Sequence, residues 1–341
     1  MPDQSGNLPF VSVIIPTFNR SARLTAGVQS FLAQDYPGDR YEVIVADNDS
    51  TDDTPNVIAS LVADNGIVRR VLEKRRGAHF ARNSAAKAAR GEILYFTDDD
   101  MIAAPDMLRS LVTGFDLSPG IGVVTGRVVP SWETEPPRWV LEYCQNALLS
   151  LNDLGDATIV SDTDPGVFSC HEAILREAFF RAGGFNPDTN AGEFTGDNET
   201  GLNLKVAALG YRFAYVGAAK IQHVIPAARM TQDYLNSRFA DQGYCDSYSA
   251  YRAIRPSAAR LIRRVVGHAV LAGMSTAKAA SRKAINDPRW RLDIARVFYY
   301  RNRARYDARL IRHDKWRRFA LRSDWIDSDV RAAAELSGGD R

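Results

Sequence analysis

The chain has 341 residues, with an apolar fraction of 45% and a charged fraction of 25%, and both fractions are ordinary for a globular protein. They exclude disordered and collagen-like architectures, and the length allows one catalytic domain with an appendage. Three cysteines without a CxxC spacing argue against a disulfide framework or a structural zinc site. We find no secretory leader and no apolar run long enough to span a membrane, so we expect a cytoplasmic protein.

The net charge of +2 conceals an uneven distribution along the chain. Residues 252–341 hold 22 Lys and Arg against 9 Asp and Glu, a surplus of +13, which leaves −11 for the rest. An acidic front joined to a basic tail indicates two surfaces with different partners.

Apolar runs and helical periodicity alternate over the first hundred residues. Residues 11–15 and 41–46 are mostly apolar runs, which are typical of strands buried inside a parallel sheet. Between them, apolar residues at helical spacing predict a helix over 21–33. The same reasoning predicts helices at 54–63 and 80–90, and strands at 67–72 and 92–96. This alternation predicts an α/β fold with a doubly wound, mostly parallel sheet.

The alternation weakens after residue 115. We expect a strand at 123–129, a proline-interrupted loop at 132–139, and helices at 172–182 and 199–209. Beyond residue 226 the chain is expected to be mostly helical and increasingly basic.

Two polar loops, at residues 47–52 and 97–100, follow predicted strands at their carboxyl ends, where open α/β sheets bind ligands. Asp98, Asp99 and Asp100 are adjacent, and crowded carboxylates repel one another unless a cation lies between them. Oxygen ligands of this kind suit Mg²⁺ or Mn²⁺ shared with substrate phosphates. The alternative is a solvated acidic turn that caps the next helix.

Five blocks of this sequence resemble the successive motifs of family 2 glycosyltransferases, in the family's order and at its approximate spacing. The blocks are residues 11–20, 43–54, 77–100, 181–188 and 196–223. The resemblance covers roughly residues 10–225. It implies the A-type glycosyltransferase fold, a nucleotide-diphospho-sugar donor, a divalent metal (Mn²⁺ or Mg²⁺) and inversion at the anomeric carbon.

The resemblance also implies roles for individual residues on the donor side. The expected nucleotide-sugar-binding residues are Pro16, Thr17, Asn19, Asp47, Asn48, Arg82, Asp98 and Asp99. Asp100 would ligate the metal, together with His223, for which a purely structural role is the alternative. The alternative for residues 47–53 is an Asx-rich turn that caps the following helix.

The general base is expected to be a carboxylate far along the chain. Asp197 matches the Asp of the family's Glu-Asp motif, although Gly196 stands where the Glu usually does, so Glu199 or Glu193 could substitute for it. A carboxylate that merely stabilises a helix N-terminus is the alternative.

Weaker signals concern the acceptor and the tail. Trp132 could stack on an acceptor sugar and His171 could touch it, although core packing would explain both residues. Basic residues cluster at 260–264, 301–305 and 315–319 in a region that also contains Val, Phe, Tyr and Trp, a pattern that suits an interfacial helix on anionic lipid. A helical face packed on the catalytic domain is the alternative. We expect a peripheral position at the inner face of the membrane and no binding of nucleic acid.

The sequence therefore predicts three parts and one activity. Residues 1–115 would bind the nucleotide sugar, 116–225 the acceptor, and 226–341 would form the basic helical region. The predicted activity is transfer of a sugar, from UDP by the family's preference, to a saccharide or lipid-linked acceptor in surface polysaccharide or glycolipid synthesis. Alternatives are a sugar-nucleotide pyrophosphorylase, whose glycine-rich signature is missing near the N-terminus, and a non-catalytic nucleotide-sugar-binding subunit.

Overall fold

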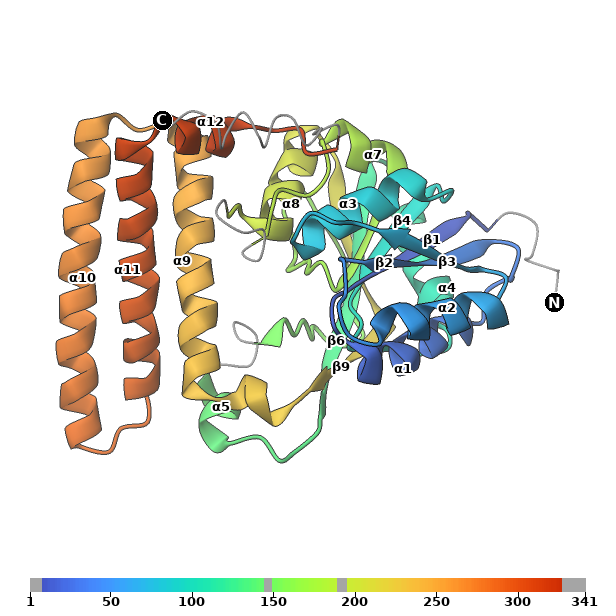
Figure 1. Cartoon of the computed structure of the whole chain (residues 1–341), viewed down its shortest axis with the longest axis horizontal. Helices are drawn as coiled ribbons and strands as arrows, with labels where there is room; N and C mark the ends of the chain where they lie inside the picture. Colours follow the sequence, from blue (N-terminus) through green and yellow to red (C-terminus); the bar gives the residue numbers. More distant parts are fainter. Residues whose placement is uncertain (1–7, 144–148, 189–194, 327–341) are drawn as a thin grey trace. The chain divides into compact units, whose positions relative to one another are not determined.

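The computed structural model describes residues 8–143, 149–188 and 195–326, and it divides the chain into two compact units (Figure 1). Unit 1 contains residues 1–131, 150–186 and 199–224. Unit 2 contains residues 132–149, 187–198 and 225–341. The division into three parts that the sequence suggests stays a prediction.

One half of the sheet of unit 1 is parallel. Its strands are β3 (Val68–Leu72), β2 (Tyr41–Asp47), β1 (Val11–Thr17) and β4 (Ile93–Thr97), in this spatial order. Every residue of β1 and β2 is buried, as expected for continuous apolar runs. The connecting helices are α1 (Ser21–Leu32), α2 (Thr54–Asp64) and α3 (Ala78–Ala88). The predicted α/β class is confirmed.

The other half of the sheet is antiparallel and follows β4 in the order β8, β6, β9, β5. These strands are β8 (His171–Leu175), β6 (Ile121–Trp132), β9 (Arg212–Ile225) and β5 (Met101–Ala103), while β7 (Thr158–Ser161) pairs with β9. The helices of this half are α4 (Met107–Val112), the 3₁₀-helix η2 (Thr113–Asp116), α7 (Arg176–Arg181) and α8 (Asn198–Ala208).

The helix expected over residues 172–182 is wrong in its first half. Residues 171–175 form β8, which pairs with β4 on one side and β6 on the other, and the helix α7 begins only at Arg176. Ala173 and Ile174 have no exposed surface. Pairing with strands distant in sequence here decides the conformation, because strand preference depends on packing more than on local propensity.

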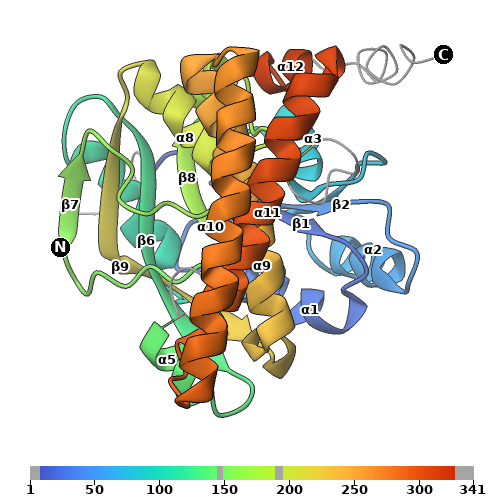
Figure 2. The ribbon, with the colours of Figure 1, turned by 90° about the vertical axis from the view of Figure 1, so that its left-hand side faces the viewer.

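Unit 2 is mostly helical. It contains α5 (Arg138–Tyr143), the 3₁₀-helix η3 (Ala227–Met230), α9 (Gln232–Ile254), α10 (Ala258–Ala284), α11 (Trp290–Arg312) and α12 (Asp314–Leu321). The long helices lie side by side, with α11 packed against both α9 and α10 (Figures 1 and 2). The expected helical C-terminal region is confirmed. No helix of the described part of the chain is long and apolar enough to cross a membrane.

Several aromatic residues near the C-terminus belong to the core of unit 2. Tyr306, Trp316 and Phe319 are buried. The Tyr306 and Trp316 ring centroids lie 5.2 Å apart, and Phe319 contacts Tyr248 at 5.8 Å. These three rings therefore pack between helices and are not available to lipid, while membrane association of the tail stays a prediction.

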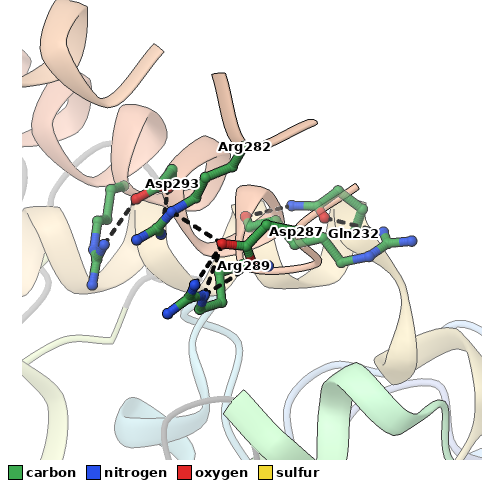
Figure 3. Close-up of polar contacts among 7 residues, drawn as sticks. Gln232, Arg282, Asp287, Arg289 and Asp293 are labelled. Carbon is green, nitrogen blue, oxygen red and sulfur yellow. Dashed lines mark hydrogen bonds and ion pairs between the residues drawn. The ribbon is translucent and has the colours of Figure 1, made fainter. Parts of the chain in front are cut away.

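Several basic side chains of the tail are neutralised within unit 2. Figure 3 shows the turn between α10 and α11, where Arg282 binds Asp293 at 2.7 Å and Arg289 binds Asp287 at 2.7 Å. Separately, the Gln232 amide of α9 donates to the Arg291 carbonyl at 3.0 Å (Figure 3). The positive charge of the sequence therefore overstates the charge that this region presents to a partner.

Candidate active site

Three loops meet at the carboxyl edge of the parallel strands. The Thr17 hydroxyl at the end of β1 donates to Asp99 at 2.7 Å, after β4. The Asn19 amide oxygen accepts from the Thr51 backbone N–H at 2.8 Å, in the loop after β2. Hydrogen bonds therefore join the loops at the edge of the sheet where the sequence predicts ligand binding, the edge at which the carboxyl ends of parallel strands meet.

Pro16 and Asn19 shape the loop after β1. Pro16 pairs with Ala46 of β2 and is buried. Asn19 has a φ of 52°, the left-handed conformation that Asn tolerates better than most residues, and its backbone N–H donates to the Ser50 hydroxyl at 3.1 Å. The Asn19 side chain thus braces the neighbouring loop, and its contact with a nucleoside stays a prediction.

Asp47 and Asn48 are held by protein partners. Buried Asp47 forms an ion pair with Arg70 and accepts from the Ser50 backbone N–H at 3.0 Å, which is the Asx-type turn considered as an alternative. The Asn48 amide donates to the Glu73 carbonyl at 2.9 Å and accepts from the Gly77 N–H at 2.8 Å. These contacts order the chain before α3, and base recognition by either residue stays a prediction.

Arg82 of α3 reaches the end of β4. Its guanidinium forms an ion pair with Asp98, and the Arg82 side chain is 4% exposed against 36% for Asp98. A ring contact with Phe185, at 5.9 Å from the guanidinium carbon, holds the same side chain. Because a guanidinium stays charged and presents a planar fork of donors, Arg82 is suited to bind phosphate oxygens near Asp98.

Asp100, in the turn directly before β5, lies close to His223 of β9. His223 is the register partner of Met101, and its Nε2 is 3.8 Å from Asp100 Oδ1. Both side chains are buried. Burial, followed by the neighbouring charge of Asp100, raises the pKa of Asp99 to about 7.

The pair fits a divalent cation that completes its coordination elsewhere. The described residues contain no group of three or more His, Cys, Asp or Glu that could hold a metal. A carboxylate oxygen and an imidazole nitrogen are nevertheless suitable donors for first-row divalent ions. Mg²⁺ and its relatives are commonly held by one or two protein ligands together with substrate phosphates and water.

Glu199 acts electrostatically on the same buried thiol as Asp98 and Asp100. Burial raises the pKa of the Cys170 thiol, and the charges of Asp98, Glu199 and Asp100 raise it further. Glu199 is in the first turn of α8, 3.9 Å from the His79 imidazole.

Asp197 has different surroundings. It belongs to unit 2, whereas unit 1 resumes at Glu199. Asp197 is 2% exposed and accepts a hydrogen bond from the Ser249 hydroxyl at 2.7 Å. Glu193, the other alternative base, lies outside the described residues.

Glu172 was not singled out from the sequence. It lies on β8 opposite Phe96, is completely buried, and neither carboxyl oxygen has a hydrogen-bond partner among the described residues. Burial raises the pKa of Glu172 well above its usual value, and the nearby charges of Glu199 and Asp164 contribute to the shift. The sequence signal that could have identified Glu172 was an acidic residue inside an otherwise apolar segment.

The two weak acceptor candidates differ. His171 shares hydrogen bonds with the Tyr95 hydroxyl at 2.8 Å and the Ala219 carbonyl at 2.9 Å, and burial lowers its pKa to about 4. Both ring nitrogens of His171 are therefore used inside the core, and its contact with an acceptor stays a prediction. Trp132 ends β6 and is half-buried, and its acceptor contact stays a prediction.

Comparison with known proteins identifies the class. Residues 12–182 match the family described as glycosyl transferase family 2, and this match covers half of the chain. The chain belongs to this family. Membership leaves the pyrophosphorylase alternative without support.

Individual relatives show how far the similarity extends. The uncharacterized glycosyltransferase YfnE of Bacillus subtilis is 42% identical over 97 residues, which span 28% of this chain and 24% of that protein. The glucosyl-dolichyl phosphate glucuronosyltransferase of Haloferax volcanii is 25% identical over 242 residues, or 69% of this chain and 75% of that protein. The chain thus aligns with about a quarter of the first relative and three quarters of the second.

A solved structure shares the fold. It is the mannosyltransferase PcManGT from Pyrobaculum calidifontis in complex with GDP-Man and Mn²⁺, which superimposes with a TM-score of 0.53 at 22% identity. The similarity covers 98% of this chain and 80% of that one. The expected A-type glycosyltransferase fold is confirmed.

Proposed function

We propose that this enzyme transfers a sugar from a nucleoside diphosphate, UDP by the family's preference, to a hydroxyl of a saccharide or lipid-linked acceptor. The observation that carries the proposal is the convergence of Arg82, Asp98, Asp100 and His223 at the carboxyl edge of the sheet. Arg82 offers forked donors to a diphosphate, and the partly exposed Asp98 can accept from ribose hydroxyls.

Asp100 and His223 would hold Mn²⁺ or Mg²⁺, with diphosphate oxygens among the remaining ligands. When bound, the cation neutralises charge that develops on the departing nucleoside diphosphate. The Mn²⁺ and GDP-Man in the structurally similar mannosyltransferase support this proposal.

For the general base we favour Glu199, the alternative to Asp197. Glu199 shares unit 1 with Asp98 and Asp100, and the charges of all three carboxylates raise the pKa of the Cys170 thiol. Its side chain is 21% exposed, whereas Asp197 is almost fully buried and accepts from Ser249. A base must reach the proton that it removes, so exposure near the donor residues favours Glu199.

The proposed reaction is a single displacement. The acceptor oxygen forms a bond to the anomeric carbon while Glu199 takes its proton, and the bond from that carbon to the diphosphate breaks with its electron pair on the leaving oxygen. Because attack and departure occur on opposite faces of the sugar, the anomeric configuration inverts.

The relative from Haloferax volcanii supports a lipid-linked acceptor, since its name specifies glucosyl-dolichyl phosphate. We therefore propose a role in surface polysaccharide or glycolipid synthesis, at the inner face of the membrane.

Release of nucleoside diphosphate from UDP-, GDP- and dTDP-sugars tests the activity without knowledge of the acceptor, because water can replace it. We expect slow hydrolysis of one nucleotide class in Mn²⁺, and none in excess EDTA. Binding of a nucleotide sugar without any release, even in the presence of candidate acceptors, would instead favour the non-catalytic binding subunit.

A further inference from the structure

One face of α10 exposes a row of apolar side chains. Ile262, Val266, Val270 and Met274 are 52%, 59%, 56% and 62% exposed, and they recur at every fourth residue. At 100° per residue these four side chains cover about 120° of the helix surface. We call them the α10 stripe. An exposed apolar row of this length on a folded protein indicates a binding surface.

The opposite face of α10 is buried by packing against its neighbours. Its buried residues are Leu261, Ala272, Ser275 and Ala279, and α10 packs against α11 in Figure 2. The α10 stripe therefore does not stabilise the three-helix packing, and its exposure has no explanation within unit 2.

The charges beside the stripe are all positive. The helix α10 contains six Lys and Arg and no Asp or Glu. Arg264 and Arg282 point to internal partners, Asp307 at 3.0 Å and Asp293 at 2.7 Å. Arg260, Arg263 and Lys278 are exposed, have no ion pair with a described residue, and lie about 100° to 160° around the helix from Ile262. Arg260 and Lys278 border the stripe on one side, and Arg263, at about 100°, falls within the arc that the stripe covers.

The charge pattern distinguishes two possible partners of the stripe, which are a second copy of the chain and an anionic lipid surface. Two copies that pair through α10 would bring basic borders together, and the helix has no acidic residue to compensate them. An anionic lipid surface complements both features, since it accepts apolar side chains below its head groups and attracts the cations at their level. Lipid is therefore the occupant that the surface fits.

We propose that the α10 stripe docks this protein on an anionic bilayer, with α10 lying in the plane of the interface. The biological role of docking, which is to hold the enzyme where lipid-linked acceptors are, rests on the proposed function. The docking itself does not depend on it. It narrows the broader expectation of a basic, aromatic tail, because the aromatic residues Tyr306, Trp316 and Phe319 of that tail are buried.

Flotation of the full-length chain with two kinds of vesicle tests the proposal. One kind is pure phosphatidylcholine, and the other contains 30% phosphatidylglycerol, on the order of physiological anionic content. We expect binding to the anionic vesicles at low salt, with release as salt screens the attraction. Replacing Arg260, Arg263 and Lys278 by Gln should weaken partitioning roughly a hundredfold, about fivefold for each cation.

A stripe variant and a matched control separate the stripe from general charge. V266E/M274E places two carboxylates on the stripe, and V62E/L117E places two at exposed apolar positions of unit 1. The stripe variant should lose vesicle binding and the control should keep most of it. All four positions are exposed, so both variants should fold, which circular dichroism and donor hydrolysis in solution check.

Three outcomes would overturn the proposal. They are equal binding by the stripe variant and the control, no binding of the wild type to anionic vesicles, and a lipid-free dimer by light scattering that V266E/M274E makes monomeric. The last would assign the stripe to a second copy of the chain. Donor hydrolysis needs no vesicle, so its absence would count against the proposed function and leave this inference standing.

Discussion

The carboxylates around the proposed site differ in their surroundings, and the differences separate their roles. Asp98 is partly exposed and paired with Arg82, whereas Asp100 is buried beside His223. Glu199 is partly exposed, and Glu172 is buried without a hydrogen-bond partner among the described residues. Such contrasts in burial and charge are how one site provides metal ligands and a base from the same chemical group.

The base assignment is tested by two nearly isosteric substitutions. E199Q should lower the turnover of donor hydrolysis by about 10² to 10⁴-fold, the usual contribution of a general base, without weakening donor binding. D197N is the matched control and should retain most of the turnover. Loss of turnover in D197N with activity kept in E199Q would return the base to Asp197.

Glu172 should make stability depend on pH. Burial raises its pKa in the native state, while the unfolded chain titrates near the usual 4.5, so the native state holds more protons above that pH. Wild-type stability should therefore fall as pH rises from about 4.5, by at most about 1.4 kcal/mol per pH unit, until the native pKa is passed. E172Q removes this dependence.

Thermal unfolding of wild type and E172Q between about pH 4.5 and 9 measures the effect. The stability of the variant relative to wild type should increase with pH. A difference that does not change with pH would show that Glu172 is not held protonated in the native protein.

The place of a polar residue in the fold could be predicted from the sequence where the residue follows a recognisable buried strand. Asp98 to Asp100 directly follow an apolar run, so their place at the sheet edge followed from the strand alone. Asp197 and Glu199 stand two residues apart, and nothing in the local sequence tells which compact unit each one joins. Glu172 was missed because its lack of partners depends on strands far away in sequence.

At the scale of elements, the parallel strands were predictable and β8 was not. Strands buried on both faces leave continuous apolar runs, which β1, β2 and β4 show. The five residues of β8 carry no such run, and the helical segment that follows made a longer helix the natural interpretation. Its conformation comes from pairing with β4 and β6.

The close crossing of α9 and α11 can be tested at Gly243. A Cβ added there would lie 2.4 Å from the Tyr299 carbonyl oxygen of α11, so G243A should destabilise the protein by about 1–3 kcal/mol. Gly273 of α10 has no described atom within 4 Å of an added Cβ. G273A should therefore gain up to about 1 kcal/mol from helix propensity. Urea unfolding that gave both variants the same sign would contradict this packing.

At the scale of the whole molecule, the last part of the chain belongs to the second compact unit. Unit 2 resumes at Ile225 and is mostly helical from there. The segments 132–149 and 187–198 also belong to it, although they lie far earlier in sequence. Composition could not assign them, because membership of a compact unit depends on tertiary contacts rather than on residue type.

The central claim is that a nucleoside diphosphate and a divalent metal bind together at the edge formed by Asp98, Asp100 and His223. A ligand at a hundred times its Kd stabilises the native state by about 2.7 kcal/mol. Melting curves with UDP, GDP and dTDP, in Mn²⁺ and in EDTA, therefore measure this claim directly, with D100N as the site variant.

In wild type, one of the three nucleotides should raise the melting temperature by several degrees in Mn²⁺ and by much less in EDTA. D100N should still unfold in a cooperative transition. It should lose the part of the nucleotide-induced rise in melting temperature that depends on Mn²⁺. No shift with any nucleotide in Mn²⁺, or a full metal-dependent shift in D100N, would contradict the site.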